Sequence, residues 1–197
     1  MLTANQLKIF LEMHHGMITI QQALGIGINY KALNRLVFNR KLERVNQSVY
    51  IDPLIFKDAF VLAQLRFPKG IFCCKTALYL YDMLQKAPDK LEMTFPHNYN
   101  AEKLASFHIH AYRQVNALYT LGINSVKTSS GNLVYAYNIE RTLCDIIRPP
   151  HIAQVELVAY SVQKYIKQRN NNIKLLMYYA KVLHVQEKIR TFMEAML

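Results

Sequence analysis

The sequence predicts an α+β fold in two parts: a small domain over residues 1–65 and a mixed α/β domain over residues 66–197 that ends in a helical segment. Three observations support this prediction. Helical spacing precedes two short β-runs near the N-terminus, β-like and helical segments alternate in the middle, and helical spacing returns after residue 150. With 197 residues and 52% hydrophobic content, the chain has enough apolar side chains for two cores.

An amphipathic helix is expected first, over residues 3–13. Its apolar side chains Leu7, Phe10, Leu11 and Met13 are expected to point inward. The helix would then complete a core with the two helices that follow it.

Two further helices are predicted on either side of a tight turn. The Thr19 side chain can cap a short helix, and Asn29 can cap a second helix that ends near Asn39. Between them, Gly25 and Gly27 can adopt the positive φ that a tight connection needs. These two glycines lack the third glycine and the preceding strand of a phosphate-binding loop, so we interpret them as a turn.

The second of these helices is predicted to have two chemically different faces. At helical spacing, Leu33, Leu36 and Val37 share the side that would pack on the domain. The opposite side carries groups that can hydrogen-bond base edges or phosphates. These groups are Lys31, Asn34 and Arg35.

A β-hairpin is expected next, from residues 41–45 and 48–51 on either side of Asn46 and Gln47. Helix, turn, basic helix and hairpin in this order are typical of a winged helix-turn-helix, in which the hairpin is the wing. Phe38 projects toward the basic side of the helix, and we expect the wing to cover it.

The charge of this segment favours DNA as its partner. Between Asn29 and Arg44 the chain has five cations and one acid, Glu43. The DNA-contacting residues are predicted to be Thr19, Gln21, Asn29, Tyr30, Lys31, Asn34, Arg35, Arg40, Lys41, Arg44, Gln47 and Ser48.

The whole chain is basic, with a net charge of +11 and a pI near 9.6. Residues 1–65 have a net charge of +3 and residues 66–197 a net charge of +8, so the second domain is also expected to face an anionic partner.

After the hairpin, residues 54–65 predict a linking helix anchored by Phe56, Phe60 and Leu65, and residues 67–70 break it at the domain boundary. The second domain is predicted to contain a helix over 75–84, strands over 91–95, 107–112 and 131–137, and helices over 139–147, 152–167, 173–183 and 185–196. The apolar stripe expected on the helix over 152–167 consists of Val155, Val158, Ala159, Val162 and Ile166.

A charged group stands out inside this apolar sequence. On a helix, Arg141, Asp145 and Arg148 would lie on one face at i, i+4 and i+7. They form either a structural ion ladder, which is the simpler interpretation, or a phosphate site in which Asp145 orients the two guanidinium groups. Four further lysines lie on helices without an obvious structural partner. The surface expected to carry the second domain's function therefore comprises Arg141, Asp145, Arg148, Lys164, Lys167, Lys174 and Lys181.

The sequence predicts no metal, no cofactor and no catalytic residue. His108 and His110 would share a face of a strand, but no nearby Cys, Asp or Glu completes a ligand set. The acids are too scattered for metal-assisted nucleotidyl transfer or nuclease chemistry, and no nucleophile-elbow motif is present. The three cysteines, an odd number without a recognisable secretion signal, are expected to be free thiols in the cytoplasm. No apolar run is long enough to span a membrane.

Taken together, several sequence segments resemble the AbiEi antitoxins of bacterial type IV toxin-antitoxin systems. The similarity covers nearly the whole chain. It comprises the Gly16-x-Ile18-Thr19 and Val49-Tyr50-Ile51 segments, Gly70-Ile71 and Thr76-Ala77-Leu78, Tyr119 to Gly122, Gly131, Val134, Glu140-Arg141-Thr142, Asp145 and Arg148, and a closing series with Tyr179, Ala180, Val185 and Met193-Glu194.

This resemblance implies a non-enzymatic protein with two activities. The winged domain would repress the protein's own operon by binding inverted repeats, and the second domain would counter a cognate nucleotidyltransferase-like toxin, as in abortive infection and phage resistance. In type IV systems the antitoxin acts without a stable complex with the toxin, although direct contact or modification of the toxin stays open. Two alternatives are a nucleic-acid-modifying enzyme that the winged domain positions and a ligand-sensing transcription factor.

Overall fold

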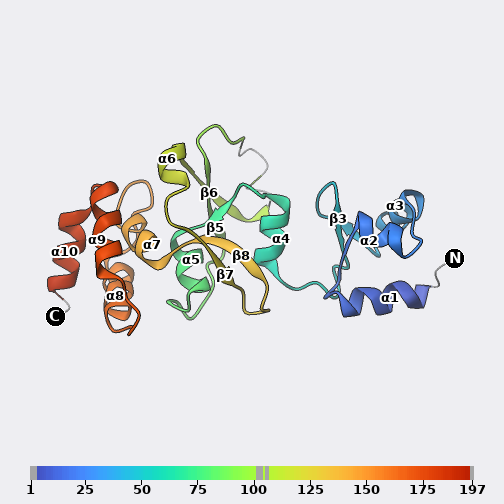
Figure 1. Cartoon of the computed structure of the whole chain (residues 1–197), viewed down its shortest axis with the longest axis horizontal. Helices are drawn as coiled ribbons and strands as arrows, with labels where there is room; N and C mark the ends of the chain where they lie inside the picture. Colours follow the sequence, from blue (N-terminus) through green and yellow to red (C-terminus); the bar gives the residue numbers. More distant parts are fainter. Residues whose placement is uncertain (1–3, 101–103, 105–106, 196–197) are drawn as a thin grey trace. The chain divides into compact units, whose positions relative to one another are not determined.

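The computed structural model describes residues 4–100, 104 and 107–195, and this part of the chain has an α+β fold with ten helices and two sheets. The chain forms two compact units, Met1–Pro68 and Lys69–Leu197, here called the N-terminal unit and the C-terminal unit (Figure 1). The division falls within the predicted 67–70 break.

The described residues of the N-terminal unit form four helices: α1 (Ala4–Met13), α2 (Ile20–Gly25), α3 (Tyr30–Phe38) and α4 (Ala59–Arg66). The first three enclose a core that includes Leu11, Ala23 and Leu33. Met13 was expected in this core, but it is 74% exposed. It lies only two residues after Leu11, which places it on nearly the opposite side of the helix.

A three-stranded antiparallel sheet accompanies these helices, in the order β1-β3-β2. The expected hairpin consists of β2 (Glu43–Arg44) and β3 (Val49–Ile51), both shorter than predicted, and β1 (Met17–Thr19) was not predicted. The Asn46 side chain stabilises the turn, because its Oδ1 accepts from the amides of Ser48 (2.8 Å) and Val49 (3.0 Å). Its Nδ2 donates to the Leu65 carbonyl (2.8 Å) and so connects the hairpin to α4.

The linking helix α4 begins later than expected. The Asp58 carboxylate accepts hydrogen bonds from the amides of Phe60 and Val61, both at 3.1 Å, and thereby caps the helix at Ala59. Phe60 is buried, whereas Phe56 and Leu65 are partly buried against the hairpin residues Val45, Val49 and Ile51.

A mixed five-stranded sheet forms the centre of the C-terminal unit, in the order β6-β5-β4-β8-β7. The strands are β4 (Ile71–Phe72), β5 (Leu91–Pro96), β6 (Ile109–Gln114), β7 (Ile123–Lys127) and β8 (Leu133–Tyr137). Pairs β5/β6 and β4/β8 are parallel, and pairs β4/β5 and β7/β8 are antiparallel. Strands β4 and β7 were not predicted, and the other three match the expected strands with shifted ends.

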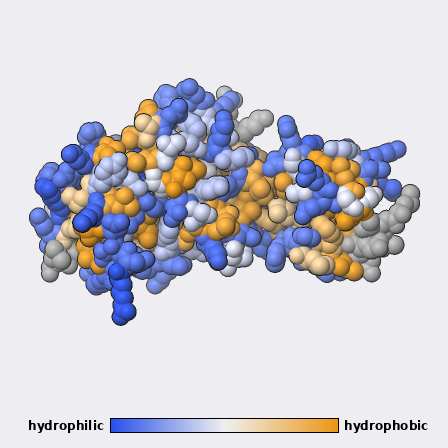
Figure 2. Space-filling view, viewed as in Figure 1, coloured by the Kyte–Doolittle hydropathy of each residue, from blue (hydrophilic) through white to orange (hydrophobic). Residues whose placement is uncertain are grey.

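In the part of this unit that the structure describes there are also six helices: α5 (Cys74–Leu80), α6 (Asn116–Tyr119), α7 (Ile139–Asp145), α8 (Val155–Ile166), α9 (Ile173–Val182) and α10 (Gln186–Glu194). Helices α7 to α10 pack together around a core that includes Leu143, Val162, Leu176 and Ile189 (Figure 1). Helix α8 starts three residues later than expected, and Val155 at its first position is 66% exposed instead of belonging to the apolar stripe. Hydrophilic side chains cover the outer surface at α9 and α10 (Figure 2).

No helix in the described residues is both long and apolar enough to cross a membrane.

Candidate functional site

The α2-turn-α3 segment is built by side-chain caps that the sequence predicted. Thr19 Oγ1 accepts from the Gln22 amide (3.2 Å), while Gln22 Oε1 accepts from the Thr19 amide (2.9 Å), so the two residues form a reciprocal capping box. Asn29 Oδ1 accepts from the Ala32 amide (2.9 Å) and starts α3. Both Thr19 and Asn29, which were expected to contact DNA, therefore have a structural role.

Only one of the two turn glycines adopts the expected conformation. Gly27 has a φ of +82°, in the left-handed region, whereas Gly25 is the last residue of α2 and its φ is not positive. The connection between α2 and α3 therefore depends on Gly27.

Helix α3 has the two faces that the sequence predicted. Leu33 is fully buried, and Leu36 and Val37 are partly buried in the same core. On the other side, Lys31, Asn34 and Arg35 are exposed. Tyr30 at the start of the helix is 56% exposed.

Two exposed cations follow α3. Arg40 and Lys41 are exposed, and in the part of the chain that the structure describes neither forms an ion pair. The one acid of this segment, Glu43, pairs with Arg66 of α4. Its charge is therefore already compensated from outside the segment, which leaves the exposed cations around α3 unbalanced.

Arg44 differs from these cations because it stabilises the hairpin. Its Nε donates to the Asn46 carbonyl (3.1 Å), its Nη2 donates to the Gln47 carbonyl (3.3 Å), and its guanidinium carbon lies 5.9 Å from the centre of the Tyr50 ring. The remaining predicted contact residues Gln21, Gln47 and Ser48 are exposed.

The expectation that the hairpin covers Phe38 is wrong. Phe38 is the last residue of α3 and is 87% exposed. No other large hydrophobic residue in the described part of the chain is as exposed. Spacing along the helix predicted the direction of its side chain, but it could not predict whether another element covers the ring.

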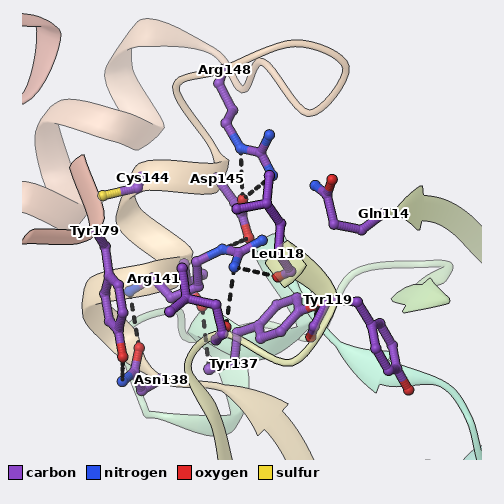
Figure 3. A network of polar contacts seen from close by, with 12 residues as sticks. Gln114, Leu118, Tyr119, Tyr137, Asn138, Arg141, Cys144, Asp145, Arg148 and Tyr179 are labelled. Carbon is purple, nitrogen blue, oxygen red and sulfur yellow. Dashed lines mark hydrogen bonds and ion pairs between the residues drawn. The ribbon is translucent and has the colours of Figure 1, made fainter. Parts of the chain in front are cut away.

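In the C-terminal unit, Arg141, Asp145 and Arg148 form the predicted ion network (Figure 3). Arg141 Nε donates to Asp145 Oδ2 (2.9 Å), and Arg148 Nε donates to Asp145 Oδ1 (2.9 Å). Arg141 Nη1 also donates to the carbonyls of Leu118 (2.8 Å) and Leu121 (3.1 Å), and its guanidinium carbon lies 4.5 Å from the Tyr137 ring centre. The network thus joins α7 to the α6 segment and to β8.

The burial of this network corrects part of the predicted functional surface. Arg141 and Asp145 are 0% and 1% exposed, so neither side chain can belong to a surface. Arg141 directs its donors at protein acceptors, which favours the structural ladder over the phosphate site. Arg148 is mostly buried, with its side chain 14% exposed.

The predicted lysines also differ from one another. Lys164 was expected to lack a partner, but its Nζ donates to the Asp82 carbonyl (2.7 Å) and lies 5.8 Å from the Tyr160 ring centre. Lys167 at the end of α8 and Lys174 and Lys181 on α9 are exposed.

The histidines that the sequence singled out are not assembled into a site. His108 precedes β6 with a φ of +54°, and the His110 ring packs on Tyr112, with centres 4.7 Å apart. Among residues 4–100, 104 and 107–195, no group of three or more His, Cys, Asp or Glu is arranged to hold a metal ion.

A third histidine, His151, was missed by sequence reasoning. It is buried, its ring centre lies 4.0 Å from that of Tyr112, and neither ring nitrogen has a hydrogen-bond partner among the described residues. Burial is the main cause that lowers its pKa to about 4; the charge of Asp145 opposes this shift, and the charges of Arg148 and Arg141 act with it. His151 directly follows Pro149 and Pro150 and belongs to no helical or strand pattern in the sequence, so nothing in the sequence indicated its burial.

The cysteines are free, as predicted, and all three are buried. Burial raises the pKa of the Cys74 thiol and raises that of Cys144 to about 12, so these thiols are protonated near neutral pH.

No known protein-family model matches this chain, and no curated protein is significantly similar to it.

Proposed function

We propose that the N-terminal unit is a winged helix-turn-helix that binds duplex DNA, with α3 in the major groove and the β2–β3 hairpin as the wing. The observation that carries the proposal is the exposed face of α3, where Lys31, Asn34 and Arg35 lie together opposite the buried Leu33. A helix about 10–12 Å across fits a major groove about 12 Å wide.

The chemistry of this face supports reading of bases as well as binding of phosphates. Asn34 can form two hydrogen bonds with adenine, and Lys31 and Arg35 can donate to guanine or to phosphates. Arg40 and Lys41, exposed just after α3, supply positive charge for the DNA backbone on either side of the groove.

In this proposal the protein is a non-enzymatic antitoxin that represses its own operon and counters a nucleotidyltransferase-like toxin. The antitoxin role rests on the sequence resemblance to the AbiEi antitoxins. It is supported by the division into two compact units, which allows separate surfaces for DNA and for protection. Lys167, Lys174 and Lys181 are the exposed cations proposed for protection.

DNA binding is tested by electrophoretic mobility shift with a duplex from the protein's own promoter. If about six phosphates are neutralised, the logarithm of the association constant should fall against the logarithm of salt concentration with a slope of about −5. Lys31→Ala and Arg35→Ala should weaken binding, and the one that contacts a base should also reduce the preference for promoter over random DNA. Lys57→Ala, at an exposed lysine outside α3, is the matched control and should have no effect.

The proposed DNA interface would be overturned by a salt-independent affinity, or by wild-type binding in both the Lys31 and the Arg35 variant.

The antitoxin role requires a nucleotidyltransferase gene beside the gene for this protein, and a lone gene would count against it. The role is tested by co-expression with that nucleotidyltransferase. The Lys31→Ala/Arg35→Ala double variant should lose repression of a promoter reporter and still protect cells. The Lys174→Glu/Lys181→Glu double variant should repress and fail to protect. Full protection by the second variant would remove these lysines from the proposal, and absence of protection by the wild type would refute the antitoxin role itself.

A further inference from the structure

The exposed face of α3 also carries the aromatic ring of Phe38, which can neither donate hydrogen bonds to bases nor pair with phosphates. Phe38 follows Lys31 by seven residues, Asn34 by four and Arg35 by three. These spacings place all four side chains on one face of the helix, with Phe38 about 10 Å along the axis from Lys31. Leu33, the fully buried residue of α3, points nearly the opposite way.

Among the described residues of the N-terminal unit, none shields this ring from water. Phe38 is 87% exposed, and the three residues that follow it, Asn39, Arg40 and Lys41, are exposed as well. Figure 2 shows hydrophobic and hydrophilic side chains intermixed over the region of α2 and α3. Since Phe has a lower helix propensity than Ala, local helix stability does not explain the residue either.

We infer that Phe38 is a specificity-determining residue that packs against the C5-methyl group of a thymine in the major groove. The inference rests on the proposed DNA binding by α3. The major-groove edge of each A·T pair exposes one methyl group among polar atoms, and an apolar side chain on a groove-bound helix distinguishes that pair by contact with the methyl.

The surroundings of Phe38 favour DNA over a protein partner. Lys31, Arg35, Arg40 and Lys41 are exposed around it, and in the described part of the chain none of them has an ion-pair partner. A second copy of this surface would bring these cations within one Debye length, about 8 Å at physiological salt, of an identical set. Duplex DNA instead presents one negative charge per about 1.7 Å.

The experiment is a thymine-to-deoxyuridine scan of the shortest promoter duplex that the full-length protein protects in footprinting. Each substitution removes one methyl group and leaves all hydrogen-bonding atoms in place. The affinity of the wild type is expected to fall about fourfold at one thymine in each half-site, the factor that corresponds to one lost methyl contact. Phe38→Ala is expected to bind the unmodified duplex about 5–10-fold more weakly and to be insensitive to deoxyuridine at that same position.

Two variants control for unspecific effects. Phe38→Leu keeps an apolar side chain and should retain part of the methyl sensitivity. Leu54→Ala removes an 81% exposed apolar side chain from the turn after β3, outside α3, and should change neither affinity nor sensitivity.

The inference is overturned if the wild type binds the promoter and no position shows a deoxyuridine effect that Phe38→Ala abolishes. A Phe38→Ala variant that binds as tightly as the wild type would overturn it too. Failure of the wild type to bind promoter DNA at all is a different result, which refutes the proposed function on which the inference rests.

Discussion

Replacing Asp145 by Asn should destabilise the C-terminal unit by about 3–5 kcal/mol, the range observed when one member of a buried ion pair is removed. The substitution keeps the shape of the side chain and removes its charge. Asp145 is 1% exposed and accepts from two guanidinium groups, those of Arg141 and Arg148, at 2.9 Å each.

The expected loss of stability follows from the interactions that each arginine retains in the variant. Arg141 is fully buried, and with Asn at position 145 its positive charge is left with neutral groups alone: the Asn oxygen, the carbonyls of Leu118 and Leu121, and the Tyr137 ring. A hydrogen bond to a charged group contributes about 1.5–3 kcal/mol, and an unpaired buried charge adds a desolvation cost. Arg148 is partly accessible to water and should contribute less.

The assay is thermal unfolding followed by circular dichroism, with hydrogen exchange of the α7 amides to report on the C-terminal unit separately. For a unit of about 129 residues, 1 kcal/mol corresponds to roughly 4 °C, so the melting temperature should fall by roughly 10–20 °C. The double variant Arg141→Met/Asp145→Leu should lose less than Asp145→Asn, because it leaves no unpaired charge at position 141. A loss below about 1 kcal/mol for Asp145→Asn would refute the structural role assigned to the network.

Four further outcomes are expected. Asn29→Ala removes the side-chain cap of α3 and should cost about 1 kcal/mol in urea unfolding, with Asn29→Asp as a control that retains the cap. Gly122→Ala should cost about 1–3 kcal/mol, because Gly122 has a φ of +79° and a Cβ there would lie 2.9 Å from the Arg141 Cβ; wild-type stability would contradict this. The pKa of His151 is lowered from 6.5 to about 4, so between these values the unfolded chain binds a proton that the folded chain does not, and stability should fall by up to about 3 kcal/mol as the pH decreases from 6.5 to 4. This part of the pH dependence should be absent in His151→Gln. Finally, the purified protein should turn over no nucleotide or nucleic acid with Mg²⁺ or Mn²⁺. Detection of such an activity, together with its loss on substitution of Glu140, would support the enzyme alternative instead.

The elements predicted well are those that short-range chemistry specifies. Thr19 and Asn29 each bond to an amide three residues away, so the starts of α2 and α3 could be predicted from local sequence. Strand β4 was missed because it has two residues and is defined by pairing with β5 and β8, which are distant in sequence. Strand β7 pairs with β8, the next strand along the chain, but four of its five residues are exposed, so no alternation of buried and exposed side chains indicated a strand.

Side-chain direction was easier to predict than side-chain environment. Helical spacing placed Phe38 on the side of Lys31 and Arg35, but whether another element covers it depends on the hairpin's position in space. Likewise, Lys164 bonds to the Asp82 carbonyl, 82 residues earlier, which no local pattern reveals. Arg141 was included in the predicted functional surface, but it is fully buried, and its burial depends on carbonyls 20 and 23 residues away.

The net charge of the chain does not locate its function, but burial and pairing of individual charges do. Arg66 is paired with Glu43, and Arg141 and Arg148 are paired with Asp145, so these cations can release few counterions on binding DNA. Lys31, Arg35, Arg40 and Lys41 are exposed around α3, and Lys167, Lys174 and Lys181 are exposed in the C-terminal unit. Each phosphate contact changes the slope of log affinity against log salt by about one. Measuring this slope for Lys31→Ala/Arg35→Ala and for Lys174→Glu/Lys181→Glu, each compared with the wild type, therefore shows whether the first set of cations, the second set or both contact DNA. A slope altered only by the α3 substitutions would leave the second set free for a partner other than the operator, which is the condition that separate repression and protection require.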